Sequence, residues 1–194
     1  MTKKASPTSA VDTRITPISL PDLKDQLRID HSDQDRMLIG KIKAAVSEIE
    51  AYIDGPVIQR SMTLKLSAWE DEIQLLPGPV LAIVSIRYYD TDNVQQTLDA
   101  ADYELYEENR IDRLVAVSDW PVVYDRKDAI EIVYQAGLAA SVTQVPTNVK
   151  EAVLLRASTR YSMPEEAGIG TVAWNIENDF NAESLLMPYK LMHC

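Results

Sequence analysis

The chain has 194 residues, of which 46% are hydrophobic and 25% charged, as in an ordinary globular protein. Thirty acidic residues against nineteen basic ones give a net charge of −11, which argues against a protein that holds nucleic-acid phosphates with Lys and Arg. The single cysteine, Cys194, excludes an intrachain disulfide and fits a reducing compartment. No apolar run approaches the ~20 residues that span a bilayer, and Lys3 and Lys4 do not precede the apolar stretch of a secretory signal. We therefore expect no membrane association, and assembly in the cytoplasm.

The N-terminal third predicts a flexible arm followed by two helices. Residues 1–14 are small and polar and form the expected arm. A short helix is predicted over 19–28, with leucines along one face. A long amphipathic helix is predicted over 33–54, where an apolar stripe recurs at helical spacing: Leu38, Ile42, Ala45, Ile49 and Tyr52. We expect Ile42, Ile49 and Ile53 to be buried.

The ends of the long helix carry their own signals. Ser32 is the expected cap, and Asp33 and Asp35 place negative charge where the helix dipole favours it. At the other end, Gly55 is expected to take the left-handed position, and Pro56 prevents continuation of the helix.

A β-rich insertion is predicted over about 57–135. There the apolar period changes from helical to alternating, and β-branched and aromatic residues become frequent. The expected strands are 57–66, 72–76, 80–89, 94–98, 103–106, 110–115 and 129–135.

A late helix over 147–162 follows Pro146, and Pro164 ends it. Residues 164–194 contain apolar side chains but no long periodic element, so they are predicted to be an extended C-terminal interaction arm. The fold class is α+β. Its helical core comprises the short, long and late helices. With the β-rich insertion it forms a single core over 15–163.

The order of these segments resembles the head–tail connector family of long-tailed bacteriophages, also called adaptor or head-completion proteins. The segments that carry the resemblance are ISLPDLKDQLRIDHSDQDRMLI at 18–39, IEAYIDGPVIQRS at 49–61, LPGPVLAIVSIRYYD at 76–90, IVYQAG at 132–137, VPTNVKEAVLL at 145–155 and SLLMPYK at 184–190. Together they span about residues 15–190.

The resemblance implies a structural protein of the virion neck, without enzymatic activity or cofactor. Such proteins form a ring, typically of twelve copies, that docks under the portal protein once DNA is packaged. The ring extends the DNA channel, lets DNA pass without sequence-specific binding, and receives the stopper or tail-completion protein.

Two sets of side chains are candidate sites for this role. Exposed apolar residues on an arm are typical of partner contacts, and the arm offers Trp174, Phe180, Leu185, Leu186, Met187 and Tyr189. The span 90–112 holds eight carboxylates, with Arg110 as its one basic residue. A negative channel wall would repel DNA phosphates, and its expected members are Asp90, Asp92, Asp99, Asp102, Glu104, Glu107 and Glu108.

Other functions find less support in the sequence. The two histidines, His31 and His193, lie in an expected turn and in the arm, where a catalytic triad has no rigid setting. One cysteine and two histidines do not make a structural zinc site. The motif GIGTVA at 168–173 lacks the βαβ unit of a dinucleotide-binding site.

A small DNA-binding regulator of helix-turn-helix type remains the alternative. The predicted helices at 19–28 and 33–54 have the right succession, but the start of the second carries Asp33 and Asp35 instead of basic and amide side chains.

Overall fold

A computed structural model describes residues 6–7, 15–108, 111–162 and 181–190. The chain has a mixed α+β fold and divides into two compact units. By their described residues, the helical unit contains 15–58, 139–162 and 181–190, and the β unit contains 6–7 and 59–138. Residues 15–163, which the sequence analysis treats as one core, therefore contribute to both units.

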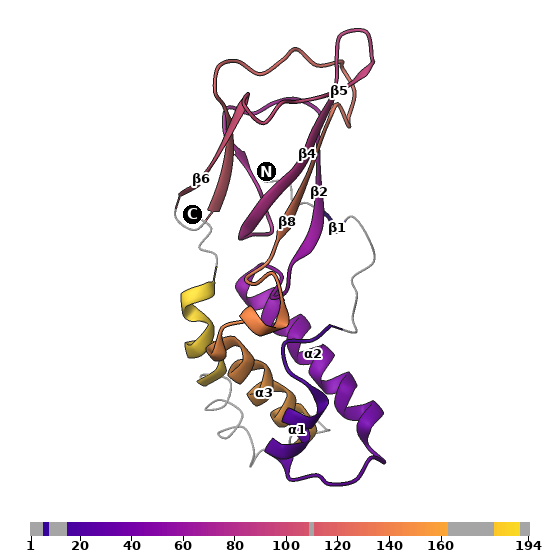
Figure 1. Ribbon diagram of the computed structural model, residues 1–194, viewed down its shortest axis with the longest axis vertical. Helices are drawn as coiled ribbons and strands as arrows, with labels where there is room; N and C mark the ends of the chain where they lie inside the picture. The colour runs from indigo at the N-terminus through magenta and orange to yellow at the C-terminus, as the bar shows by residue number, and fades with distance from the viewer. Residues whose placement is uncertain (1–5, 8–14, 109–110, 163–180, 191–194) are drawn as a thin grey trace, which may run out of the picture. The chain divides into compact units, whose positions relative to one another are not determined.

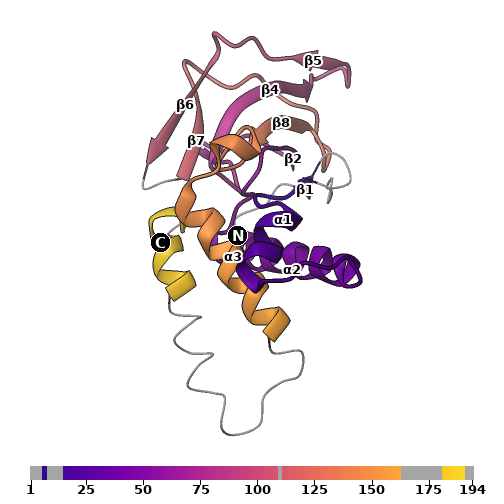
Figure 2. The same ribbon diagram turned by 60° about the horizontal axis from the view of Figure 1, so that its bottom comes forward.

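The helical unit contains α1 (Leu20–Leu27), α2 (Asp35–Ile53) and α3 (Thr147–Ser162) (Figure 1). A short 3₁₀ turn, η1 (Val142–Gln144), precedes α3. Figure 2 shows α1 and α3 beside α2. Their shared interior confirms the predicted burial of Ile42, Ile49 and Ile53, which are at most 2% exposed.

The start of α1 is a capping box. Asp22 N donates to Ser19 Oγ at 3.3 Å, and Ser19 N donates to Asp22 Oδ2 at 2.8 Å. Each side chain therefore satisfies a backbone donor that the helix itself leaves free. Ser19 Oγ also donates to Asp22 Oδ2 at 2.7 Å, and this bond, followed by the one from Ser19 N, holds the pKa of Asp22 below its usual value.

The two predicted caps of α2 are wrong. Gln34 is the N-cap residue and makes no side-chain capping bond, because Ser32 instead closes a tight turn with its carbonyl, which accepts from Asp35 N at 3.1 Å. At the C-terminal end Asp54, not Gly55, has the left-handed conformation, with φ of 57°. Asp tolerates this region better than most residues do because its short side chain bonds locally.

The β unit contains two antiparallel sheets. The larger has the strand order β1 (Ser6–Pro7), β2 (Arg60–Leu66), β8 (Ile130–Ala136), β4 (Val80–Tyr89) and β5 (Gln95–Thr97). The smaller has the order β3 (Ile73–Gln74), β7 (Ile111–Ala116) and β6 (Tyr103–Glu108). Each predicted strand is present, although β2 begins three residues later than expected and β3 is only two residues long.

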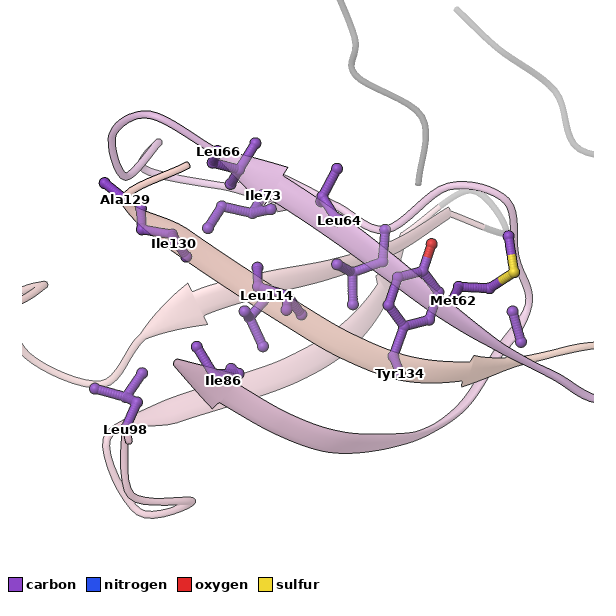
Figure 3. Close-up of a cluster of buried hydrophobic side chains, with 13 residues drawn as sticks. Met62, Leu64, Leu66, Ile73, Ile86, Leu98, Leu114, Ala129, Ile130 and Tyr134 are labelled. Atoms are coloured by element: carbon purple, nitrogen blue, oxygen red, sulfur yellow. The ribbon is translucent and has the colours of Figure 1, made fainter. Parts of the chain in front are cut away.

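Both sheets contribute to one apolar interior (Figure 3). Leu64 of β2 and Ile132 of β8 pair across the larger sheet, and Leu114 of β7 comes from the smaller one. Tyr134 is fully buried, and its hydroxyl donates to the carbonyl of Pro77 at 3.3 Å. Burial raises the pKa of this tyrosine well above its usual value.

Candidate functional site: a C-terminal surface and an acidic β unit

The described part of the C-terminal arm is a short helix that packs on the helical unit. Residues 181–186 are helical and continue into the 3₁₀ turn η2 (Met187–Tyr189). Both views place this segment beside α3 (Figures 1 and 2). Ala182 and Leu186 are buried, whereas Met187 is 64% exposed. The described part of the predicted extended arm is therefore helical and packs on the chain's own helical unit.

Charged and aromatic contacts hold the same segment in place. Glu183 Oε1 lies 3.6 Å from Arg156 Nη2 on α3. Arg156 also approaches Glu48 of α2, with 3.5 Å between Nη1 and Oε1. At the end of the segment, Lys190 Nζ lies 4.6 Å above the ring centre of Tyr52, a cation–π contact.

The six predicted interface residues differ in their exposure to solvent. Leu186 is occupied within the chain's own fold, Met187 is open to solvent, and Leu185 and Tyr189 are half-buried. Trp174 and Phe180 lie outside the described residues.

A groove of about 980 Å³ lies elsewhere on the helical unit. Its lining comes from the segment before α1 and from α1, α2 and α3, and includes Ile15, Ile18, Ile39, Lys150 and Leu154. No sequence signal pointed to this groove, because it arises only where three helices meet.

The predicted acidic residues fall into a turn group and a strand group. Asp90 organises the turn between β4 and β5: its Oδ1 accepts from Val94 N at 2.9 Å, and its Oδ2 accepts from Gln96 Nε2 at 2.7 Å. The Gln96 bond, followed by the backbone bonds, lowers the pKa of Asp90. Asp99 closes the next turn by accepting from Ala101 N at 3.0 Å. Asp92 and Asp102 are exposed nearby in sequence.

The strand group lies on β6, one of the two edge strands of the smaller sheet. Glu104, Glu107 and Glu108 are exposed there. Glu108 Oε2 pairs with Arg113 Nε at 3.1 Å across the β6–β7 hairpin. Charged side chains on a sheet edge discourage pairing with a foreign strand. The exposed carboxylates of both groups belong to the β unit. Residues that form one acidic surface on a subunit must lie in the same unit, and these residues do.

Asp112 differs from the other carboxylates of its span because it is buried. Its Oδ2 accepts a hydrogen bond from Val80 N at 2.7 Å. Burial, with a smaller contribution from the charge of Glu107, raises the pKa of Asp112. This residue is therefore a structural acceptor and not part of an exposed surface.

The part of the chain that the structure describes does not bring the residues considered for chemistry together. His31 is exposed in the turn between α1 and α2, and His193, Cys194 and the motif at 168–173 lie outside the described residues. Among the described residues, no group of three or more His, Cys, Asp or Glu side chains is placed to hold a metal ion. No helix in the same residues has both the length and the apolar character to cross a membrane.

A family model for phage gp6-like head–tail connector proteins matches residues 17–113, half of the chain. The chain belongs to this family. The match includes α1, α2 and the strands from β2 to the first half of β7, so it confirms the resemblance drawn from the sequence. No curated protein matches the chain.

Solved structures share the fold of the connector over nearly its whole length. A chain from the neck of an empty gene transfer agent (GTA) particle, computed with C6 symmetry, has a TM-score of 0.78 and 22% identity, with 99% of this chain and 97% of that chain covered. A chain from the neck of the native GTA particle, computed with C12 symmetry, has a TM-score of 0.76 at the same identity and coverage. So does a chain from the virion of the native particle.

The start of α2 carries acidic groups where a DNA-reading helix carries basic ones. Asp35 Oδ1 is paired with Lys24 Nζ at 2.8 Å, so this lysine is engaged with a carboxylate of its own chain.

Proposed function

We propose that this chain is a structural protein of a virion neck that assembles into a ring of twelve copies between the portal protein and the tail. Its membership of the head–tail connector family carries the proposal. The fold shared with chains of the GTA neck supports the location, and the C12 symmetry of one of these necks supports the copy number.

The ring joins the filled head to the stopper or tail-completion protein and extends the DNA channel. The acidic residues Asp90, Asp92, Asp99, Asp102, Glu104, Glu107 and Glu108 contribute to the channel wall or rim. A negative wall keeps phosphates in solution and so limits adhesion of the moving DNA. A ring structure with all seven on the outer perimeter would refute this part of the proposal.

The C-terminal segment provides the portal contact. Met187 is its exposed apolar side chain in the described part, and Trp174, Phe180, Leu185 and Tyr189 complete the proposed surface. Leu186 holds the segment on the helical unit, so it supports the contact from beneath.

Mass measurement tests the proposal directly. The purified chain is measured alone and after mixing with purified portal assemblies, by native mass spectrometry and by mass photometry. We expect a stable complex with twelve copies of the chain on each portal. Absence of any complex, together with sequence-specific retention of a DNA fragment, would instead favour the helix-turn-helix regulator.

A further inference from the structure

Strand β4 carries two β-bulges in its first half. Its register with β8 shifts by one residue at two points, where the extra residues are Leu81 and Val84. At each bulge two adjacent residues of β4 lie opposite one residue of β8, Gln135 at the first and Val133 at the second. Gln135 and Val133 flank the buried Tyr134, so they face away from the apolar interior. The bulges therefore place Leu81 and Val84 on the outer face of the larger sheet.

These two side chains are exposed on that face. Leu81 is 44% exposed and Val84 is 56% exposed, whereas Ile83 and Ile86 of the same strand pack in the interior. Strict alternation from Ile86 would instead turn Val84 inward. With the exposed Ala82, the two residues form an apolar patch, which the bulges build by turning side chains outward.

The three middle strands of the larger sheet carry an excess of positive charge, although their surroundings are acidic. Residues 59–138 contain fifteen acidic residues against seven basic ones. Strands β2, β8 and β4, which lie side by side (Figure 1), contain one acidic residue against three basic ones. The sheet that bears the apolar patch is therefore the part of the β unit where negative charge is scarce.

The single acidic residue of these strands is neutralised on the outer face. Glu131 of β8 points outward like the other odd-numbered residues of the strand, and it lies opposite Lys65 of β2 and Arg87 of β4. Its carboxylate lies 3.5 Å from Lys65 Nζ and 3.8 Å from Arg87 Nη1. Asp128, just before β8, is paired with Arg126 at 2.7 Å. Two half-exposed basic side chains to one carboxylate thus border the apolar patch.

A second copy of the chain is the partner whose charge fits this face. Each copy carries a net charge of −11, so contact between two acidic surfaces of neighbouring copies is unfavourable. In a cyclic ring one surface of each copy meets a different surface of the next. The basic and apolar face of the larger sheet complements the acidic exterior of the adjacent copy. Its apolar centre has the character of an interface core, where charged residues are depleted.

We propose that the outer face of the larger sheet, with Leu81 and Val84 at its centre and Lys65 and Arg87 at its border, is one side of the contact between adjacent copies in the ring. The contact rests on the proposed ring. The apolar centre excludes water, and the two basic side chains meet carboxylates of the next copy. Another copy, and neither the portal nor the tail-side neck protein (the stopper or tail-completion protein), covers this face.

Photo-crosslinking identifies what covers the face. Val84→Cys is made together with Cys194→Ser, so that the full-length chain has one thiol, which is labelled with benzophenone maleimide. A trace of labelled chain is mixed with excess wild-type chain, assembled on purified portal and illuminated, with and without the tail-side neck protein. We expect a product with the mass of two chains. A product that contains portal or tail-side protein, or no product from assembled rings, would overturn the inference.

Substitutions test the energy of the same contact. Val84→Asp adds a like charge to the apolar patch, so we expect the chain concentration that gives complete rings on the portal to rise at least tenfold, by mass photometry. Val84→Leu should assemble as the wild type does. Arg87→Gln, a milder change at the border, should raise the concentration by a smaller factor, and it keeps the test decisive if Val84→Asp does not fold. Circular dichroism and melting temperature check the folding of each variant.

The matched control is Val122→Asp, which makes the same change at another exposed valine, in the loop between β7 and β8. It should form rings at the wild-type concentration. An equal defect in Val122→Asp would assign the effect to net charge and overturn the inference.

The inference and the neck function fail separately. Complete rings of Val84→Asp at the wild-type concentration would overturn the inference while leaving the neck function intact. If the wild-type chain forms no complex with the portal, the neck function fails and the inference falls with it.

Discussion

At the residue scale, Asp112 shows how a carboxylate in an acidic segment acquires a structural role. It is the one buried charged side chain among the described residues, and it accepts a hydrogen bond from the backbone N–H of Val80 at the start of β4. The hydrogen bond offsets part of the cost of burial. The raised pKa means that the folded chain holds this proton to a higher pH than the unfolded chain does.

Two substitutions at this position separate charge from hydrogen bonding. Asp112→Asn keeps an acceptor without the charge, so we expect no loss of stability at pH 7. Asp112→Ala leaves Val80 N without its partner and should lower the free energy of unfolding by about 1–3 kcal/mol. Urea denaturation of both variants checks this. Equal damage from Asn and Ala would contradict the assignment.

The pH dependence follows from the same pKa. With the folded pKa above the unfolded one, the contribution of Asp112 to stability is greatest below the unfolded pKa, and it is lost as pH rises through the folded pKa. Asp112→Asn removes this term. Its stability relative to the wild type should therefore increase between about pH 4 and pH 7, measured by urea denaturation at several pH values. A difference that decreases with pH would show that the sign is wrong.

At the element scale, α2 presents one face to the interior and another to solvent. Ile49 is 1% exposed, whereas Ile39 on the same helix is 40% exposed and lines the groove. Ile49→Ala should therefore lower the free energy of unfolding by about 2–5 kcal/mol, and Ile39→Ala by much less. Thermal denaturation of the isolated chain compares the two. Unchanged stability of Ile49→Ala with loss of ring formation would make this face an inter-subunit contact.

The short C-terminal helix likewise has one buried residue that packs on the helical unit and one exposed residue that is available to a partner. Leu186→Ala creates a cavity and should cost about 2–5 kcal/mol, most of it as local release of 181–190. Met187→Ala should leave stability unchanged but weaken attachment to portal-bearing heads. Hydrogen exchange on 181–190 measures the first effect, and an attachment assay measures the second. Full attachment with both Met187→Ala and Tyr189→Ala would remove this segment from the proposed contact.

At the scale of the whole molecule, charge decides how the ring treats DNA. Because the chain carries a net charge of −11, a ring of any copy number is strongly acidic. Replacing Glu104 and Glu107 with Gln removes two charges per subunit from the proposed channel surface. We expect greater retention of linear DNA by assembled rings at low salt, with the difference lost as salt screens the charges.

The control for this experiment is the pair Asp25→Asn and Asp30→Asn. It removes the same charge from exposed residues of the helical unit. Gel retardation compares wild-type rings with both double variants. An equal effect of the two pairs would assign the behaviour to net charge alone, and not to a channel wall.

The sequence by itself determined the order and type of most elements, although Ser6 and Pro7 of the predicted N-terminal arm pair with β2 as strand β1. Apolar period and β-branched content placed α2, α3 and the strands, because these signals depend on neighbours a few residues apart. The strand predicted over 80–89 from its β-branched and aromatic residues matches the observed bounds of β4, and the stripe of α2 identifies its buried isoleucines. The caps of α2 were predicted incorrectly from local signals. Ser32 and Gln34 compete as the N-cap, and Asp54 and Gly55 compete for the left-handed position at the C-terminal end.

Only the tertiary structure decided which of these side chains remain available for function. Leu186 and Met187 are neighbours of similar character, but packing buries one and exposes the other. Asp112 lies in the same acidic run as Glu107 and is nevertheless enclosed. Trp69 and Trp120 stack on each other although 51 positions separate them. The exposure of a side chain and its contacts with distant residues depend on which surfaces pack together in the folded chain. A local sequence pattern does not predict that packing.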